Sequence, residues 1–176
     1  MNICVFCSAN DVAPQYVAAA EKLGRWLGRE GHTLVYGGAN LGLMEAVARA
    51  AHEAGATVVG VVPAILEKTG RASDHIDVRV LCDSLDDRKA IMVERSDLFV
   101  ALPGGVGTLD EIFTVAASHT IGYHSKKVIL YNMKSFWNST IALLDDMASQ
   151  GMIRGNWHDY IEVATSLSEL QQMVER

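Results

Sequence analysis

The sequence predicts an α/β protein: a Rossmann-like, doubly wound parallel sheet in a single domain spanning residues 1–176. Short apolar runs alternate with amphipathic segments of helix length along most of the chain. Glycine-rich turns follow two of these runs, where sheets of this type bind ligands. A chain of 176 residues is also long enough to bury one sizeable core.

Each strand is expected where an apolar run lies between turn residues or helix ends. These runs cover residues 2–7, 33–36, 57–63, 77–82, 97–102, 127–131 and 161–164. Helical periodicity is expected at residues 14–30, 43–54, 85–95 and 135–149, after Leu109, and in a last helix capped by Ser166 or Ser168. Gly31 follows the first helix, at the place of a left-handed C-cap. Residues 64–76 are expected to form an irregular polar loop able to act as a flap.

Charge and composition exclude several classes of partner. The net charge is -6 and Lys and Arg are not clustered, which argues against nucleic acid or an anionic membrane as a partner. No apolar run reaches membrane-spanning length, and the N-terminus leads directly into a strand without a basic signal region. We therefore expect a cytoplasmic protein.

Cysteine and histidine usage gives no support for a metal centre. Cys4, Cys7 and Cys82 are odd in number, which suits reduced thiols. Cys4 and Cys7 are spaced as CxxC, but on a strand positions i and i+3 point to opposite faces. The six histidines form no HxxxH pair. We expect buried structural cysteines and no metal site.

The stretch 102–111, Leu-Pro-Gly-Gly-Val-Gly-Thr-Leu-Asp-Glu, is the most informative part of the chain. It follows an apolar strand and opens a helix, so free backbone N–H groups and the positive end of a helix dipole can meet an anion there. Its glycines permit positive φ and close approach of a ligand. Thr108 is expected to cap the helix, with Asp110 and Glu111 in its first turn.

A second glycine turn, Gly37-Gly38-Ala39-Asn40-Leu41-Gly42, follows the strand at 33–36. It lacks the GxGxxG spacing of dinucleotide-binding folds. Val62-Pro63 stands where such folds carry an acidic residue for the ribose. The turns therefore favour a mononucleotide, and they disfavour an NAD-linked oxidoreductase.

Several segments, taken together, match one family in order and with nearly unchanged spacing. They are Cys4-Val5-Phe6-Cys7, Leu34-Val35-Tyr36-Gly37-Gly38, Gly42-Leu43-Met44, Gly60-Val61-Val62-Pro63, Arg88-Lys89 with Met92, Ser96-Asp97, and the Pro-Gly-Gly-x-Gly-Thr-x-x-Glu string that ends at Glu111. The set resembles the Lonely Guy (LOG) family, cytokinin-activating nucleoside 5'-monophosphate phosphoribohydrolases that are often mislabelled as lysine decarboxylases.

The resemblance implies cleavage of the N-glycosidic bond of AMP or an N6-substituted AMP, giving free base and ribose 5-phosphate. It implies a homodimer or larger assembly, with the site near the subunit interface and no cofactor. Arg88 and Glu111 match the family's catalytic pair. Its nucleotide-binding residues are matched by Gly38, Met44, Lys89, Gly104, Gly105, Val106, Gly107, Thr108, Leu109 and Asp110.

Some positions depart from the family pattern. Leu85-Asp86-Asp87 precedes Arg88 where the family usually has Met-His-x, Ser8-Ala9-Asn10 stands in place of Gly-Ser-Ser, and Glu45 replaces a glycine. A non-catalytic nucleotide or cofactor carrier of the same fold is therefore the alternative function. The acid that protonates the leaving base is also open, with Asp110 and His119 as candidates.

Overall fold

The computed structural model describes all residues from 1 to 176 and contains one seven-stranded, fully parallel sheet. The strand order is β4-β3-β2-β1-β5-β6-β7. The strands are β1 (Asn2–Phe6), β2 (Thr33–Tyr36), β3 (Val58–Pro63), β4 (Val78–Cys82), β5 (Leu98–Ala101), β6 (Val128–Tyr131) and β7 (Ile161–Ala164). Each strand lies within one residue of the bounds predicted from the sequence, and the doubly wound single-domain fold is confirmed.

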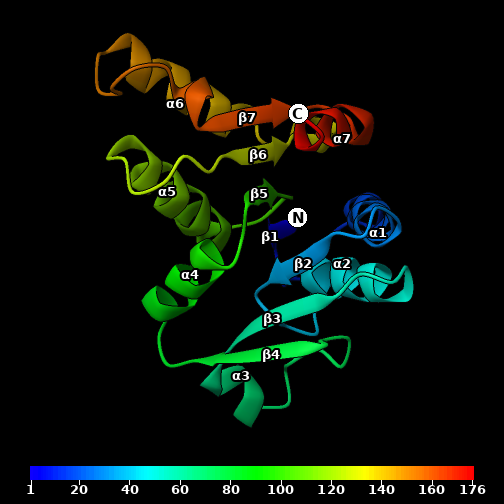
Figure 1. Ribbon diagram of the computed structural model, residues 1–176. Coiled ribbons are helices and arrows are strands. Elements are labelled where there is room, and N and C mark those ends of the chain that lie inside the picture. The colour runs from blue at the N-terminus through cyan, green and yellow to red at the C-terminus, as the bar shows by residue number, and fades with distance from the viewer.

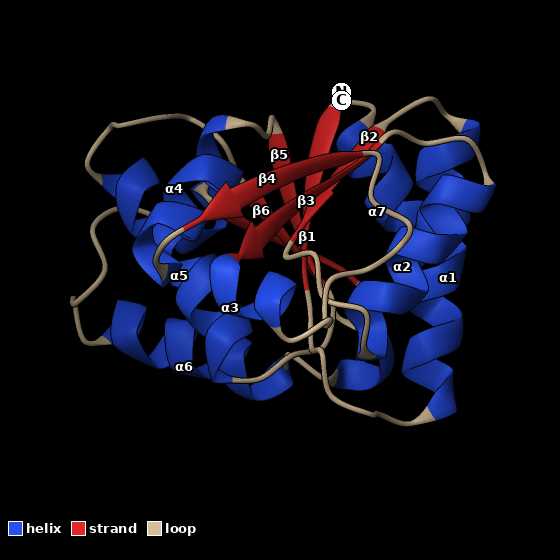
Figure 2. Cartoon of the chain, turned by 90° about the horizontal axis from the view of Figure 1, so that it is seen from below, coloured by secondary structure: helices blue, strands red, loops and turns tan.

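Helices cover both faces of the sheet (Figure 1). One layer holds α1 (Pro14–Arg29), α2 (Gly42–Glu53) and α7 (Leu167–Val174). The other holds α4 (Leu85–Glu94), α5 (Val106–Thr120) and α6 (Asn138–Ser149). Figure 2 shows these layers on either side of the sheet, with the short α3 (Ala64–Lys68) outside both. Because both faces are covered, the strands are continuous apolar runs.

Alternate residues of each strand feed two separate cores. Cys4 packs into the core under α4, α5 and α6, whereas Cys7 packs into the core under α1, α2 and α7. Both thiols and that of Cys82 are buried and free. The expected opposite orientation of the Cys4-x-x-Cys7 pair and the burial of all three cysteines are therefore confirmed.

The strand order changes direction between β1 and β5, which makes this pair the topological switch point. The connections that leave the carboxyl ends of β1 and β5 turn to opposite faces of the sheet. They stay tied to each other because the amide of Ser8 donates to the carbonyl of Pro103 at 3.1 Å. Ligands of open parallel sheets bind in the crevice that forms at such a point.

The fold corrects three local expectations. Residues 64–76 contain the helix α3, five residues long, and the rest of this segment is bonded to the Gly38–Asn40 turn, so it is not wholly irregular. The helix expected at 135–149 begins at Asn138, because Lys134 and Ser135 have φ values of 53° and 59°, which no right-handed helix accommodates. The helix expected after Leu109 already begins at Val106.

Gly31 and the last helix behave as expected. Gly31 has a φ of 70° directly after the C-cap of α1. Ser166 caps α7 through a hydrogen bond from the amide of Glu169 to its hydroxyl oxygen. Both signals are local, since they depend on residue types within one helical turn.

Candidate active site

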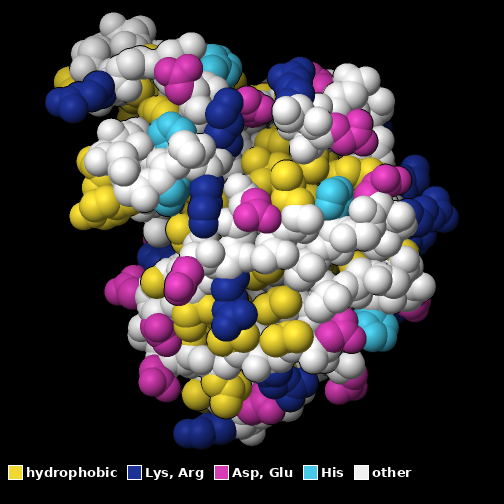
Figure 3. Space-filling model, viewed as in Figure 1, with side chains coloured by type: hydrophobic (Ala, Val, Ile, Leu, Met, Phe, Trp, Pro, Cys, Tyr) yellow, Lys and Arg dark blue, Asp and Glu magenta, His cyan; other side chains and the backbone are white.

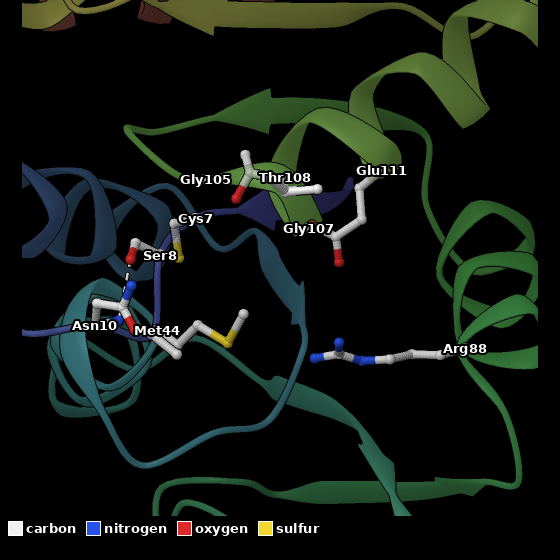
Figure 4. Close-up of a pocket in the computed structure, with 11 residues that line it drawn as sticks. Cys7, Ser8, Asn10, Met44, Arg88, Gly105, Gly107, Thr108 and Glu111 are labelled. Carbon is white, nitrogen blue, oxygen red and sulfur yellow. Dashed lines mark hydrogen bonds between the residues drawn. The ribbon is translucent and has the colours of Figure 1, made fainter.

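A cavity of about 240 Å³ opens at the switch point between β1 and β5. Its lining comes from four places in the chain: the loop after β1, the start of α2, α4, and the start of α5 (Figure 4). The lining residues are Cys7, Ser8, Ala9, Asn10, Met44, Arg88, Gly105, Val106, Gly107, Thr108 and Glu111. The two glycine turns thus approach one crevice, with Met44 beside the second of them.

The start of α5 offers unpaired backbone donors to this cavity. Gly105 is the N-cap, and the amides of Val106, Gly107 and Thr108 have no acceptor within the chain. A Cβ added at Gly105 or Gly107 would meet nothing within 4 Å, so both backbones face open space. Free N–H groups at the positive end of a 15-residue helix form an anion site.

Two details of this helix start differ from expectation. Thr108 does not cap the helix, because α5 begins at Val106, three residues before the expected start at Leu109, and no side chain caps it. Asp110 and Glu111 consequently lie beyond the first turn, which holds no acidic residue. Gly104 does not have a positive φ. Glycine is favoured there because a Cβ would overlap the Thr108 hydroxyl.

Glu111 is the buried carboxyl group of the cavity. It lies three residues after Thr108, one helical turn further along the same face of α5, and is 7% exposed. Burial raises the pKa of Glu111 to about 7, and Asp110 adds to the rise although the Arg88 guanidinium opposes it. Glu111 can therefore accept or release a proton near neutral pH.

Arg88 extends from α4 into the cavity and faces Glu111 across it (Figure 4). Its Nη2 donates to the carbonyl of Gly37 at 2.6 Å, and its Nε donates to the carbonyl of Val61 at 3.2 Å. Neither Asp86 nor Asp87 pairs with it, so it is not a helix-surface arginine. A guanidinium has five N–H donors, so several remain for a ligand.

Lys89 and Asp110 form an ion pair between α4 and α5, and they line a smaller neighbouring cavity instead of the main one. The Nζ atom of Lys89 lies 3.0 Å and 2.9 Å from the two carboxylate oxygens of Asp110, and 3.3 Å from Asp86 Oδ1. This contact with Asp110 raises the pKa of the Lys89 ammonium group. Asp86, with its side chain 94% exposed, points away from the cavity.

Other expected site residues lie elsewhere. Leu109 packs against the core under α4, α5 and α6. Gly38 has a φ of 79°, lies against Val62, and accepts a hydrogen bond from the Ser73 amide through its carbonyl. Neither residue lines the cavity. His119, a candidate acid, bonds to the Lys126 carbonyl near the far end of α5.

The loop after β1 contributes four lining residues that were not predicted from the sequence, namely Cys7, Ser8, Ala9 and Asn10. Their signal in the sequence is position alone, since they follow the first strand at its carboxyl end. The hydroxyl of Ser8 accepts from the amide of Asn10 at 3.0 Å, which shapes the loop. Burial raises the pKa of the Cys7 thiol, so the group stays protonated and is not an activated nucleophile.

No helix is both long and apolar enough to cross a membrane. No group of three or more His, Cys, Asp or Glu side chains is arranged to hold a metal ion. On the face seen in Figure 3, Lys and Arg side chains lie among Asp and Glu instead of forming a basic patch.

Comparison with known proteins adds independent information. The family described as "Possible lysine decarboxylase" matches residues 44–174. The cytokinin riboside 5'-monophosphate phosphoribohydrolase LOG4 of Arabidopsis thaliana is 39% identical over 98% of this chain and 81% of its own length. The rice protein LOGL2, a probable enzyme of the same name, is 37% identical over 98% of this chain and 71% of its own length.

Solved structures share the architecture at lower identity. The molybdenum cofactor carrier protein of Chlamydomonas reinhardtii superposes with a TM-score of 0.76 at 23% identity, covering 99% of this chain and 95% of that one. This likeness concerns the fold alone. The family match and the identity to curated relatives, by contrast, extend over the segments that build the cavity, and on these grounds the chain belongs to the LOG family.

Proposed function

We propose that the protein is a hydrolase of N-glycosidic bonds that converts a nucleoside 5'-monophosphate into free base and ribose 5-phosphate. One observation carries this proposal. The buried carboxyl of Glu111 lies one helical turn beyond the unpaired amides of α5 and faces Arg88 across the cavity. An anion site, an ionisable carboxyl and a guanidinium thus surround a space of about 240 Å³.

The start of α5 is the proposed site for the 5'-phosphate. The amides of residues 106–108 point to one end of the cavity, where the helix dipole favours negative charge. The Thr108 hydroxyl makes no hydrogen bond as a cap, so it can donate to a phosphate oxygen. Because Gly105 and Gly107 have no Cβ, nothing covers these amides.

Glu111 then lies beside the sugar. Loss of a purine from C1' builds positive charge on the ribose ring, which a neighbouring carboxylate stabilises. The same carboxylate can take a proton from the attacking water. A pKa of about 7 allows both the charged form that does this and the protonated form that results.

Arg88 is proposed to orient the substrate. Two of its N–H groups are held by the carbonyls of Gly37 and Val61, which fixes the plane of the guanidinium. The remaining N–H groups point into the cavity, where they can donate to ribose hydroxyl or phosphate oxygens. A guanidinium has N–H donors and no acceptor, so Arg88 does not serve as a general base.

The proposed substrates are AMP and N6-substituted AMP, because the curated relatives are named for cytokinin riboside 5'-monophosphates. The test is to incubate purified protein with AMP and with isopentenyl-AMP and to separate the products by chromatography. We expect free base and ribose 5-phosphate. Intact nucleotide after long incubation, in both cases, would contradict the proposal.

A carrier without catalytic activity is the second candidate, favoured by the structural likeness to molybdenum cofactor carrier proteins. A carrier needs the anion site but has no use for a buried carboxyl opposite an arginine. Calorimetry with a nucleotide and with a pterin phosphate distinguishes the two. Tight binding without base release would favour the carrier.

We also propose that the protein is a homodimer that covers the outer surface of α4 and α5. Met92 is the only α4 residue that is fully buried. Ile121 and Tyr123, at the outer end of α5, are exposed apolar side chains, and Figure 3 shows hydrophobic groups gathered there. Light scattering coupled to size exclusion should give twice the monomer mass of 19.1 kDa. A monomer at micromolar concentration would contradict this.

A further inference from the structure

We propose that Lys89 is a further catalytic residue, whose ammonium group donates a proton to the departing base in a smaller cavity between α4 and α5. This inference rests on the proposed function. Arg88, Gly107 and Glu111 line both this cavity and the larger one. The two spaces are therefore adjacent, and the smaller one is completed by Leu85, Lys89 and Asp110.

The direction of the substrate follows from α5. With phosphate on the amides at the helix start, Glu111 lies about 6 Å further along the axis, at 1.5 Å per residue from Gly107. That rise is comparable with the span from the 5'-phosphate to C1' of a ribose. The base bonded to C1' then projects beyond Glu111, toward Leu85 and Lys89.

The ammonium group of Lys89 is held in place at the wall of this smaller cavity. Of its three N–H groups, one makes a hydrogen bond, to Asp110 Oδ1 at 3.0 Å, while Asp110 Oδ2 and Asp86 Oδ1 lie 2.9 Å and 3.3 Å from Nζ. The side chain of Lys89 is 17% exposed, so it is partly shielded from water. Asp110, on α5, fixes the position of the Nζ atom.

The cavity dimensions determine which part of a base reaches Lys89. A volume of about 50 Å³ admits one edge of a purine ring but not the whole ring. One ring face would then be covered by the apolar side chain of Leu85, which lines this cavity and is 65% exposed. A ring nitrogen on the inserted edge is the atom that would receive the proton.

The step balances as follows. The bond between C1' and the base nitrogen breaks, and its electron pair goes to the base. One proton moves from Lys89 Nζ to a base nitrogen, while a water oxygen bonds to C1' and loses a proton to Glu111. Glu111 releases that proton to solvent and Lys89 regains one, so nucleotide plus water gives base plus ribose 5-phosphate.

A different role for Lys89 would be to grip the phosphate, and the product ribose 5-phosphate distinguishes the two because it lacks a base. Lys89→Met should lower kcat for AMP by about 10²–10³-fold. KM and the affinity for ribose 5-phosphate, measured by calorimetry, should change by less than about threefold. Lys127→Met is the control, since it also removes a lysine bonded to a carboxylate, Glu162, at 2.7 Å.

A second readout uses the base itself. The base of 6-chloropurine riboside 5'-monophosphate is more acidic than adenine, so it leaves with less help from a proton donor. Lys89→Met should therefore lose less than about tenfold with this nucleotide. Equal losses with both nucleotides, or a loss of ribose 5-phosphate affinity that matches the loss of turnover, would overturn the inference. If the chloropurine nucleotide is not cleaved, the affinity for ribose 5-phosphate alone tests the inference.

The outcomes separate this inference from the proposed function. Wild-type protein that releases no base would overturn the function and with it the inference. Active wild-type protein with an unaffected Lys89→Met variant would overturn only the role of Lys89. Thermal unfolding of Lys89→Met and Asp110→Asn tests the clamp between α4 and α5. A Lys89→Met variant that loses turnover yet unfolds at the wild-type temperature supports the catalytic role. A loss of turnover that follows a lowered unfolding temperature in both variants would contradict it.

Discussion

Arg88 lies directly across the backbone of Gly37, with its Nη2 donating to the Gly37 carbonyl at 2.6 Å. A Cβ at Gly37 would overlap the guanidinium. Any side chain at position 37 would therefore displace the guanidinium of an arginine 51 positions later. The first residue of the second glycine turn thus serves to seat Arg88.

Gly37→Ala should displace the Arg88 guanidinium while leaving the sheet intact. Misplacing a substrate-orienting group costs on the order of 10–100-fold in turnover. The measurement is base release from AMP, together with thermal unfolding as a test of folding. Wild-type turnover in this variant would show that the contact between Gly37 and Arg88 does not matter for catalysis.

Glu111→Gln removes the buried carboxylate but keeps its shape. If Glu111 stabilises the sugar cation or activates water, the rate should fall by about 10²–10⁴-fold. Glu162→Gln is a suitable control, because Glu162 lies on β7, away from the cavity, where it pairs with Lys127. A Glu111→Gln variant with the rate of that control would remove Glu111 from the mechanism.

The rate should also depend on pH through Glu111. Its pKa of about 7 means that the carboxylate, the form required to take a proton, increases in population as pH rises through neutrality. We expect kcat/KM to rise between about pH 6 and pH 8 and then level. Glu111→Gln should lack this limb. A wild-type profile that is flat over the same range would contradict the assignment.

The same group predicts how stability depends on pH. Its pKa is about 7 in the folded protein against an ordinary value of 4.5, so the folded state binds the proton more tightly than the unfolded state does. The free energy of unfolding therefore falls as pH rises from 4.5 to about 7. The loss, about 3 kcal/mol at most, persists at higher pH.

Urea unfolding at two pH values tests this linkage. At pH 8, Glu111→Gln should be more stable than wild type, because the variant buries no charge there. At about pH 3, well below the ordinary value of 4.5, the two should unfold alike, since Glu111 is then largely protonated in both the folded and the unfolded wild type. A variant less stable than wild type at pH 8 would show that burial of Glu111 is not a cost.

Glu45, which replaces the usual family glycine, is expected to act on the 69–76 segment and not on the cavity. Its Oε1 lies 2.8 Å from His75 Nδ1, and it does not line the cavity. The segment is also held by the Ser73 amide, which donates to Gly38. Glu45→Gly should speed hydrogen exchange around His75, at a cost of about 1 kcal/mol locally, with turnover nearly unchanged. A large loss of turnover would contradict this.

The arrangement of the elements was predictable because it depends on local signals. Apolar runs and helical periodicity located the seven strands and the longer helices, and Gly31 and Ser166 marked helix ends through residue type alone. Helix α3 was missed because five residues give no periodicity. The start of α5 was misplaced because Val106 and Gly107 have low helix propensity and no side-chain cap precedes them.

The site was predictable only as a set of residues and not as an arrangement. The resemblance brought Arg88 and Glu111 together, but the contact of Arg88 with Gly37 depends on how β2 and α4 are placed by the sheet order. Likewise, the pairing of Lys89 with Asp110 joins helices that follow different strands. The part played by Asn10 required knowing that β1 and β5 are neighbours.

The adjacency of β1 and β5 also has a mechanical consequence. Strands β1–β4 and strands β5–β7 form two halves of the sheet that meet along this one pair. Arg88 belongs to the connection between the halves, whereas Glu111 and the free amides of α5 belong to the second half and Ser8 to the first. A ligand in the cavity therefore fastens the two halves together across their seam, so occupancy should resist the opening of the sheet along β1 and β5.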